Sequence, residues 1–262
     1  MTDPFAELGP LLGMTQAWAG IGWAVFLRVS AAMAFLPAFG SQMVPVRLRL
    51  ALAGAFTVAV TPIVADMVPA PAMDVASLVT LTATETVVGL ALGFSIRLFV
   101  WLLHVMGTIA AQSMSLSQLL GAQAIDPQPA MAQIMILAGF ALAAMAGLHV
   151  RIAEAFVRSY ETFPIGLGAA ARDLSPWAIG RVAEMFATAF TFAAPFVIAS
   201  LIYNVALGVI NRAMPQLMVA FVGAPAITAG GLVLLFLTAP IVLPLWLDLL
   251  TARLADPFGT RP

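Results

Sequence analysis

Long apolar runs, interrupted by prolines and by a few charges, dominate the pattern along this 262-residue chain. A helix that crosses a membrane needs about 20 mainly apolar residues. Cutting the sequence at its charges and prolines predicts six hydrophobic helices, over residues 14–36, 50–65, 75–106, 131–149, 182–210 and 217–247. The second is short and the third and fifth are long, which favours tilted or broken helices. The pattern therefore predicts an all-α membrane protein whose six long helices are partly broken.

A charged segment, residues 151–184, separates the fourth and fifth apolar runs. Spacings of three and four place alternating charges on one helical face: Arg151, Glu154, Arg158 and Glu161. This pattern predicts an additional helix with a wet charged face and an apolar face that can pack, ending near Pro164. Ser175 followed by Pro176 predicts that the next helix starts there, with the serine as its cap.

Composition narrows the possible functions. Hydrophobic residues make up 62% of the chain and charged residues 9%, whereas soluble domains carry roughly 25% charged residues. The net charge of -1 excludes the basic surface that nucleic acid requires. Absence of cysteine excludes thiolate chemistry, and two histidines are too few to build a metal site. We therefore expect no nucleic acid, no metal, no cofactor and no enzymatic activity; Ser95 and His149 lack the motif of an intramembrane protease.

Three charges lie deep inside apolar runs: Arg28, Glu85 and Arg97. Each would cost about 2.5 to 3.5 kcal/mol at the centre of a bilayer, so each is expected to face protein or a cavity. Glu85, Gly89, Gly93 and Arg97 are spaced by four, and the two glycines allow a second helix to approach closely. The stripe predicts a contact with another subunit or with a helix of the same chain. A proton relay is a third alternative, although relays usually align several carboxylates.

The segment 107–133 is rich in uncharged polar residues and methionine, and Asp126 is its one charge. The polar residues are Gln112, Ser113, Ser115, Ser117, Gln118, Gln123, Gln128 and Gln133, and Met106, Met114 and Met131 accompany them. Amides, hydroxyls and flexible thioethers form a pliable lining that adapts to different side chains. The segment therefore predicts the lining of a passage or, alternatively, an ordinary corner between two helices.

Motifs in a fixed order along the chain carry a resemblance to a known family. They occupy residues 28–30, 37–41, 44–49, 85–97, 112–117, 126–127, 147–149, 159, 164–166 and 204–225. With this order and spacing the chain resembles the FliR family of flagellar type III export-gate proteins, whose injectisome relatives are the SctT proteins. Two positions depart from the family pattern: Ser115 stands where the family has glycine and Met218 where it has asparagine.

The resemblance implies a non-enzymatic gate subunit that forms a single membrane domain, 1–262. Residues 1–180 would be similar to a FliP-type subunit, and residues 181–262 to a FliQ-type helical hairpin with a tail. The implied partners are FliP-type and FliQ-type subunits, FlhB-type and FlhA-type export components, unfolded flagellar export substrates and membrane lipid. The implied location is the bacterial inner membrane at the flagellar basal body, projecting to the periplasmic side.

The residue patterns described above, together with this resemblance, assign roles to three sets of residues. A pore plug or gasket would contain Met106, Gln112, Met114, Ser115, Leu116 and Ser117. Helix or subunit packing would involve Arg28, Glu85, Gly89, Gly93 and Arg97. A partner-facing hairpin tip would contain Arg212, Pro215 and Gln216. Two other functions stay open. A secondary transporter would be expected to carry an inverted repeat, which we do not find in the sequence. A purely structural scaffold of the basal body makes no such demand.

Overall fold

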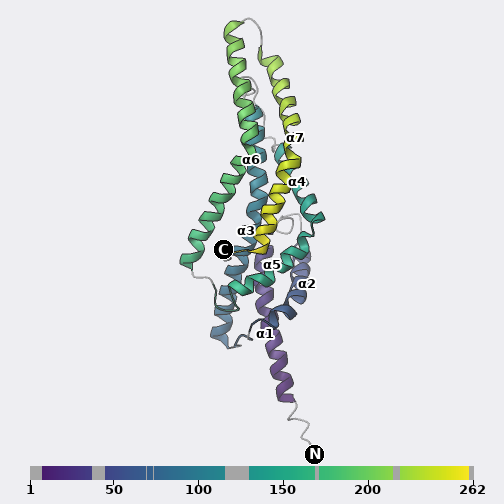
Figure 1. Cartoon of the computed structure of the whole chain (residues 1–262). Coiled ribbons are helices and arrows are strands. Elements are labelled where there is room, and N and C mark those ends of the chain that lie inside the picture. Colours follow the sequence, from purple (N-terminus) through teal and green to yellow (C-terminus); the bar gives the residue numbers. More distant parts are fainter. Residues whose placement is uncertain are drawn as a thin grey trace, which may run out of the picture. The chain divides into compact units, whose positions relative to one another are not determined.

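The computed structural model describes residues 8–36, 45–68, 70–72, 74–115, 130–168, 171–214 and 219–259. Within these ranges the backbone forms helices and no strand, which confirms the all-α prediction (Figure 1). The helices are α1 (Leu8–Met33), α2 (Val46–Ala65), α3 (Val75–Ser115), α4 (Ala130–Met145), α5 (Leu148–Thr162), α6 (Ala171–Ala213) and α7 (Val219–Ala255).

The helix boundaries differ from the predicted ones at two instructive places. The predicted helix 131–149 is divided, because Gly147 adopts a left-handed backbone conformation with φ of 75° between α4 and α5. The prediction that a helix starts at Ser175 is wrong, since α6 already begins at Ala171 and contains Ser175 and Pro176. A capping preference of about 1 kcal/mol is small beside the packing of a 43-residue helix.

The start of α3 has a cap that the sequence analysis did not identify. The Asp74 carboxylate accepts a hydrogen bond from the Ser77 backbone N–H at 3.2 Å, which satisfies one of the free donors at a helix start. Hydrogen bonds from Ser77 lower the pKa of Asp74 below its usual value. This cap therefore helps to set the position at which α3 begins.

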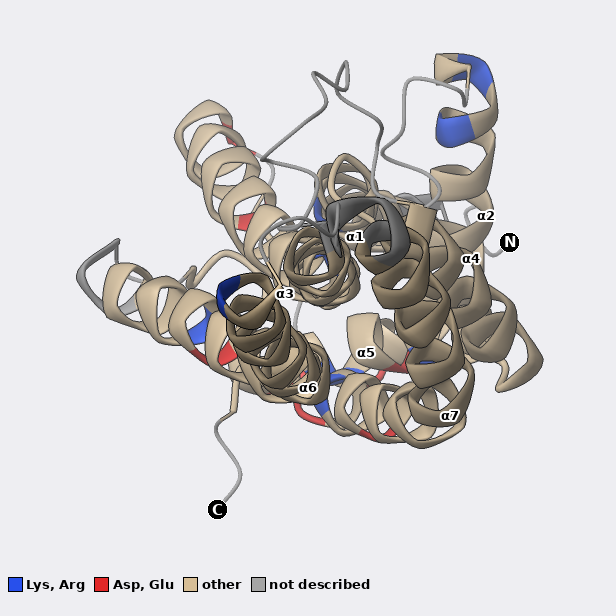
Figure 2. Ribbon diagram, turned by 90° about the horizontal axis from the view of Figure 1, so that it is seen from above, with Lys and Arg blue, Asp and Glu red and all other residues tan. Residues whose placement is uncertain are grey.

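Four of the described helices are long and apolar enough to cross a membrane, namely α2, α3, α6 and α7, or five spans if the bent pair α4 and α5 counts as one. Charged residues are sparse along the ribbon, as Figure 2 shows. Large apolar side chains on α6 and α7 are exposed, for example Phe190, Leu201 and Phe236. Extended apolar surface of this kind requires lipid or a partner protein around it.

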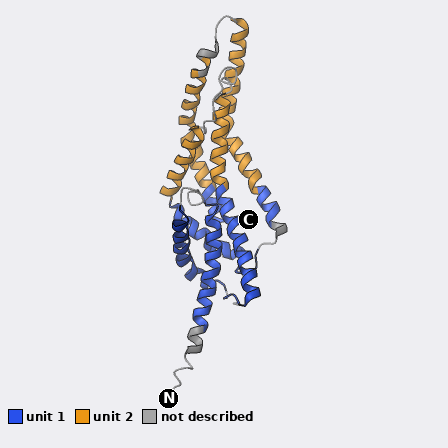
Figure 3. Ribbon diagram, turned by 180° about the vertical axis from the view of Figure 1, so that it is seen from behind, with its two compact units in different colours: residues 1–97, 147–180, 250–262 blue, residues 98–146, 181–249 orange. Residues whose placement is uncertain are grey.

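The helices are divided between two compact units (Figure 3). Unit 1 comprises residues 1–97, 147–180 and 250–262, and unit 2 comprises residues 98–146 and 181–249. In unit 1, α1 packs on α2, and α2 packs on α5. The apolar face of α5 is buried and includes Phe156 and Tyr160, whereas Arg151, Glu154 and Glu161 on its other face are exposed, as the spacing predicts.

Unit 2 is held together by close approaches at glycines and by one buried tryptophan. A Cβ atom on Gly107 of α3 would lie 2.4 Å from the Ala132 Cα atom of α4, so these two helices are nearly in backbone contact. Trp246 of α7 is 1% exposed, and its indole N–H donates to the Phe99 carbonyl of α3 at 2.8 Å. The indole ring also lies against Gly139 of α4. These contacts place α3, α4 and α7 around a common core.

Candidate functional site

The most polar buried feature of unit 1 is an ion pair between α1 and α3. The Arg28 Nε atom donates to the Glu85 Oε2 atom at 2.7 Å, and the two side chains are 0% and 1% exposed. Removing two charges from water costs several kcal/mol per ion, so such a pair persists only with good geometry and further hydrogen bonds. The surroundings of the pair supply those bonds.

The remaining guanidinium donors of Arg28 are directed at α5 and the turn that follows it. Nη1 donates to the Ser159 hydroxyl at 2.9 Å, and Nη2 donates to the Phe163 carbonyl at 2.8 Å. The guanidinium carbon lies 3.6 Å from the ring centroid of Tyr160, in the geometry of a cation–π contact. The second carboxylate oxygen of Glu85, Oε1, accepts the Gly166 backbone N–H at 3.0 Å. The Arg28 guanidinium is therefore bonded to the Glu85 carboxylate, the Ser159 hydroxyl and the Phe163 carbonyl. The Glu85 carboxylate in turn accepts from Arg28 and from the Gly166 N–H.

The two glycines of the predicted stripe lie directly against α1. A Cβ atom on Gly89 would lie 2.2 Å from the Arg28 carbonyl oxygen, and one on Gly93 would lie 2.4 Å from the Ala32 carbonyl oxygen. Because the neighbouring atoms belong to the backbone, neither helix can yield by turning a side chain. Together with the ion pair, these positions form one continuous contact between α1 and α3 of the same chain.

Arg97 is the member of the predicted packing set that the structure does not bring into this contact. Its side chain is partly exposed, and among the described residues it forms no hydrogen bond or ion pair. Within the described part of unit 1, Glu85 is also the one carboxylate in the polar network around Arg28. Relays usually align several carboxylates, whereas the Glu85 carboxylate is bonded here to the Arg28 guanidinium and the Gly166 N–H.

The second candidate site lies at the end of α3, in unit 2. Met106 and Met114 are 0% and 6% exposed, whereas Gln112 is exposed. The Ser200 hydroxyl of α6 donates a hydrogen bond to the Ser113 carbonyl of α3. Such a bond from a side chain satisfies a carbonyl that the helix end would leave free. The last turn of α3 is therefore tied to α6.

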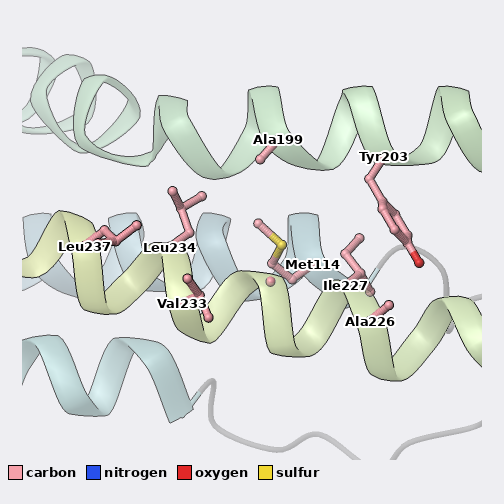
Figure 4. Close-up of a pocket in the computed structure, with 9 residues that line it drawn as sticks. Met114, Ala199, Tyr203, Ala226, Ile227, Val233, Leu234 and Leu237 are labelled. Carbon is pink, nitrogen blue, oxygen red and sulfur yellow. The ribbon is translucent and has the colours of Figure 1, made fainter.

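Met114 contributes to an apolar cavity of about 270 Å³ between α6 and α7. The cavity is lined by Met114, Ala199, Tyr203, Ala226, Ile227, Gly230, Val233, Leu234 and Leu237. In Figure 4 the Met114 side chain lies below Ala199 of α6, with Leu234 and Ile227 of α7 on either side of it. The Tyr203 hydroxyl donates to the Gly223 carbonyl at 2.7 Å, which joins α6 to α7 beside the cavity. A flexible thioether in an apolar space can change its rotamer at small cost.

Several residues of the predicted sites lie outside the described ranges: Leu116, Ser117, Pro215 and Gln216. Ser115 is the last residue of α3, and Arg212 is exposed in the last turn of α6. The two predicted sets are thus each described in part. Among the described residues, no group of three or more histidine, aspartate or glutamate side chains is arranged to hold a metal ion.

The possible protease pair is not assembled. Ser95 is 2% exposed, and its hydroxyl donates to the Leu92 carbonyl of its own helix at 2.8 Å. The side chain of His149 is exposed at the start of α5. Nucleophilic catalysis requires a base within hydrogen-bond reach of the serine hydroxyl, and no such bond joins these two described residues.

Sequence reasoning identified the charges of unit 1 but missed their partners on α5. Ser159, Tyr160 and the turn at Phe163–Gly166 belong to the charged segment, whose apolar face was expected only to pack. The position of Ser159 on that face, between Phe156 and Phe163 at helical spacing, is the signal that could have indicated a buried polar partner.

Comparison with known proteins adds an independent finding. A family model described as "Bacterial export proteins, family 1" matches residues 20–252. The flagellar biosynthetic protein FliR of Caulobacter vibrioides is 31% identical over 229 residues, which cover 86% of this chain and 90% of that protein. FliR of Escherichia coli is 28% identical over 236 residues, 87% of each chain, and FliR of Aquifex aeolicus is 26% identical over 228 residues, 83% of this chain and 84% of that protein.

Proposed function

We propose, from the premise that this chain belongs to family 1 of the bacterial export proteins, that it is a subunit of the flagellar type III export gate. Unfolded flagellar proteins would cross the inner membrane through the pore that it helps to line and seal. The observation that carries the proposal is the match over residues 20–252, together with FliR relatives aligned over most of their length. The membrane-spanning character of α2, α3, α6 and α7 supports it.

The surface of the helices supports assembly with other subunits. On the proposed gate, residues 1–180 take the place of a FliP-type subunit and residues 181–262 that of a FliQ-type hairpin, with FliP-type and FliQ-type subunits around them. Exposed Arg212, with Pro215 and Gln216, would meet an FlhB-type component. The assembly would project to the periplasmic side, so that apolar faces of α6 and α7 are covered by protein as well as by lipid.

The end of α3 supports the sealing role. Met106 and Met114 are buried, and a Cβ atom on Gly231 of α7 would lie 2.8 Å from the Met114 Cγ atom. A gasket must close around polypeptides that carry many different side chains. Methionine can adapt to them because its thioether side chain is unbranched and flexible. The proposed gasket also includes Gln112 and Ser115 to Ser117.

We expect Met114→Ala to increase ion leakage through the closed gate, because it removes the thioether from the cavity between α6 and α7. Deletion of residues 113–117 should increase leakage further. Met145→Ala is the matched control in the same unit, since Met145 is 86% exposed. Conductance of the assembled gate in planar bilayers is the measurement. Leakage equal to that of the parent in both the Met114→Ala variant and the 113–117 deletion, with normal assembly, would remove the sealing role.

Purification from solubilised membranes, followed by counting of the subunits, tests the proposed function as a whole. We expect this chain to co-purify with FliP-type and FliQ-type subunits. A photo-reactive residue at Gln112, which is exposed, should crosslink to a stalled flagellar substrate, whereas one at Met145 should not. Isolation with the partners but without a crosslink indicates a scaffold. Isolation as a lone chain that takes up a small solute indicates a transporter.

A further inference from the structure

Residues 256–259, which follow α7, are held by the turn after α5 and by α6; we call them the strap. All of these contacts lie within unit 1. Phe258 is 5% exposed, and its ring meets the Phe163 ring edge-on, with centroids 4.7 Å apart. The ring of Trp177 lies 5.6 Å from that of Phe258, and the Trp177 indole N–H donates to the Phe258 carbonyl at 3.1 Å. One aromatic residue is thus bound through both its ring and its backbone.

The end of α7 is fixed next to the strap. Arg158 of α5 donates from Nη1 to the Ala255 carbonyl at 2.9 Å, so that a cation caps the negative end of α7. The strap ends at Gly259, whose φ is 70° and whose N–H donates to the Asp256 carboxylate at 3.0 Å. This hydrogen bond closes the strap on itself around Phe258.

Phe163 belongs to both the strap contact and the buried ion pair. Its ring supports Phe258, and its carbonyl accepts the hydrogen bond from Arg28. Three residues further on, Gly166 has φ of 76° and donates its N–H to Glu85. The turn 163–166 is therefore held at one end by the buried cation and at the other by the buried anion, and Phe163 presents its ring to the strap.

We propose that the Arg28–Glu85 pair acts as a latch for the strap: by fixing the turn 163–166 it sets the position of the Phe163 ring, and Phe258 docks only on the turn in this conformation. Among the described residues, Arg28 and Glu85 form no hydrogen bond or ion pair with the strap, so they act as positioning residues through the turn. Docking of the strap and formation of the turn stabilise each other, because coupling between two sites is reciprocal. The inference does not depend on the export function.

Thiol accessibility tests this coupling on the full chain in isolated membranes, since the protein contains no cysteine. Leu254, in the last turn of α7, directly precedes the strap and is 2% exposed, so we expect release of the strap to expose a Leu254→Cys reporter. We expect Glu85→Ala and Phe258→Ala each to raise the rate of maleimide labelling at this cysteine about tenfold. Ser159→Ala is the matched control: it removes a partner of Arg28 but neither contact to the turn, so the rate should stay within about twofold.

A second reporter separates release of the strap from unfolding of unit 1. Val25 is 0% exposed in α1, and a Val25→Cys reporter should stay protected in every variant. An unchanged rate at the Leu254→Cys reporter in Glu85→Ala overturns the proposal. If the labelling rates at both reporters rise in Glu85→Ala, unfolding of unit 1 accounts for the exposure. Hydrogen exchange of the turn 163–166 in Phe258→Ala then tests the coupling from the side of the strap. Exchange about tenfold faster at Gly166 supports the coupling, and unchanged exchange refutes it.

Discussion

Replacing Glu85 with alanine is expected to lower the free energy of unfolding by about 3 to 5 kcal/mol, the usual cost of breaking one side of a buried ion pair. The variant leaves the Arg28 guanidinium buried without its counter-charge and the Gly166 N–H without its acceptor. Thermal unfolding of the purified assembly, together with the yield of assembled gate, measures the effect. If the proposed function is correct, assembly and export should fall together, because losing the contact between α1 and α3 disturbs the fold of the chain.

Two controls sharpen this prediction. Glu184→Ala breaks the pair between Arg181 and Glu184, whose side chains are 25% and 54% exposed, and should cost less than about 1 kcal/mol. A double variant with Arg28→Leu and Glu85→Leu should be more stable than either single variant, since no charge is then left unpaired. The prediction is contradicted if the Glu85→Gln variant assembles normally and loses export only over part of the pH range. That result would indicate a proton relay.

The second large effect is expected at the glycines that bring α1 and α3 together. Gly89→Ala places a methyl group 2.2 Å from the Arg28 carbonyl oxygen, so that the two helices must separate, at a cost of about 3 kcal/mol. Gly93→Ala should act similarly, since its nearest atom is the Ala32 carbonyl oxygen at 2.4 Å. Thermal unfolding and assembly yield are again the measurements.

Gly54→Ala provides the matched control in the same unit. Gly54 lies within α2, and a Cβ atom added to it would meet no atom within 4 Å. Alanine favours a helix over glycine by about 1 kcal/mol, so this variant should be as stable as the parent or slightly more stable. Equal stability of all three alanine variants would show that the contact at Gly89 and Gly93 can relax without cost.

Helix α5 shows which structural features the residue pattern predicts and which it does not. The spacing of Arg151, Glu154, Arg158 and Glu161 predicts the wet face of α5, and the structure has this face exposed except at partly buried Arg158. The pattern does not predict that Arg158 reaches the Ala255 carbonyl, because the two residues are 97 positions apart in the sequence. The failure at Ser175 has a related cause: a local start signal yields when a long helix is stabilised elsewhere along its length.

The candidate sites were predictable to different degrees. Position in an apolar run identifies Arg28 and Glu85 as charges that need protein around them, and a spacing of four identifies Gly89 and Gly93 as a place of close approach. Neither observation indicates which helix approaches. The cavity beside Met114 could not be predicted at all, since its lining comes from three helices.

Residues within a few turns of one another were enough to establish that this chain is apolar and helical and that it hides a small number of charges, because hydropathy and helical period are local properties. Only the tertiary structure determined which groups the buried charges bind. Arg28 is 57 positions from Glu85 and 135 positions from Phe163 in the sequence, and only the packing of α1, α3 and α5 brings these groups within hydrogen-bond distance. A buried charge specifies that a partner must exist, and the geometry of the packed helices decides which one it is.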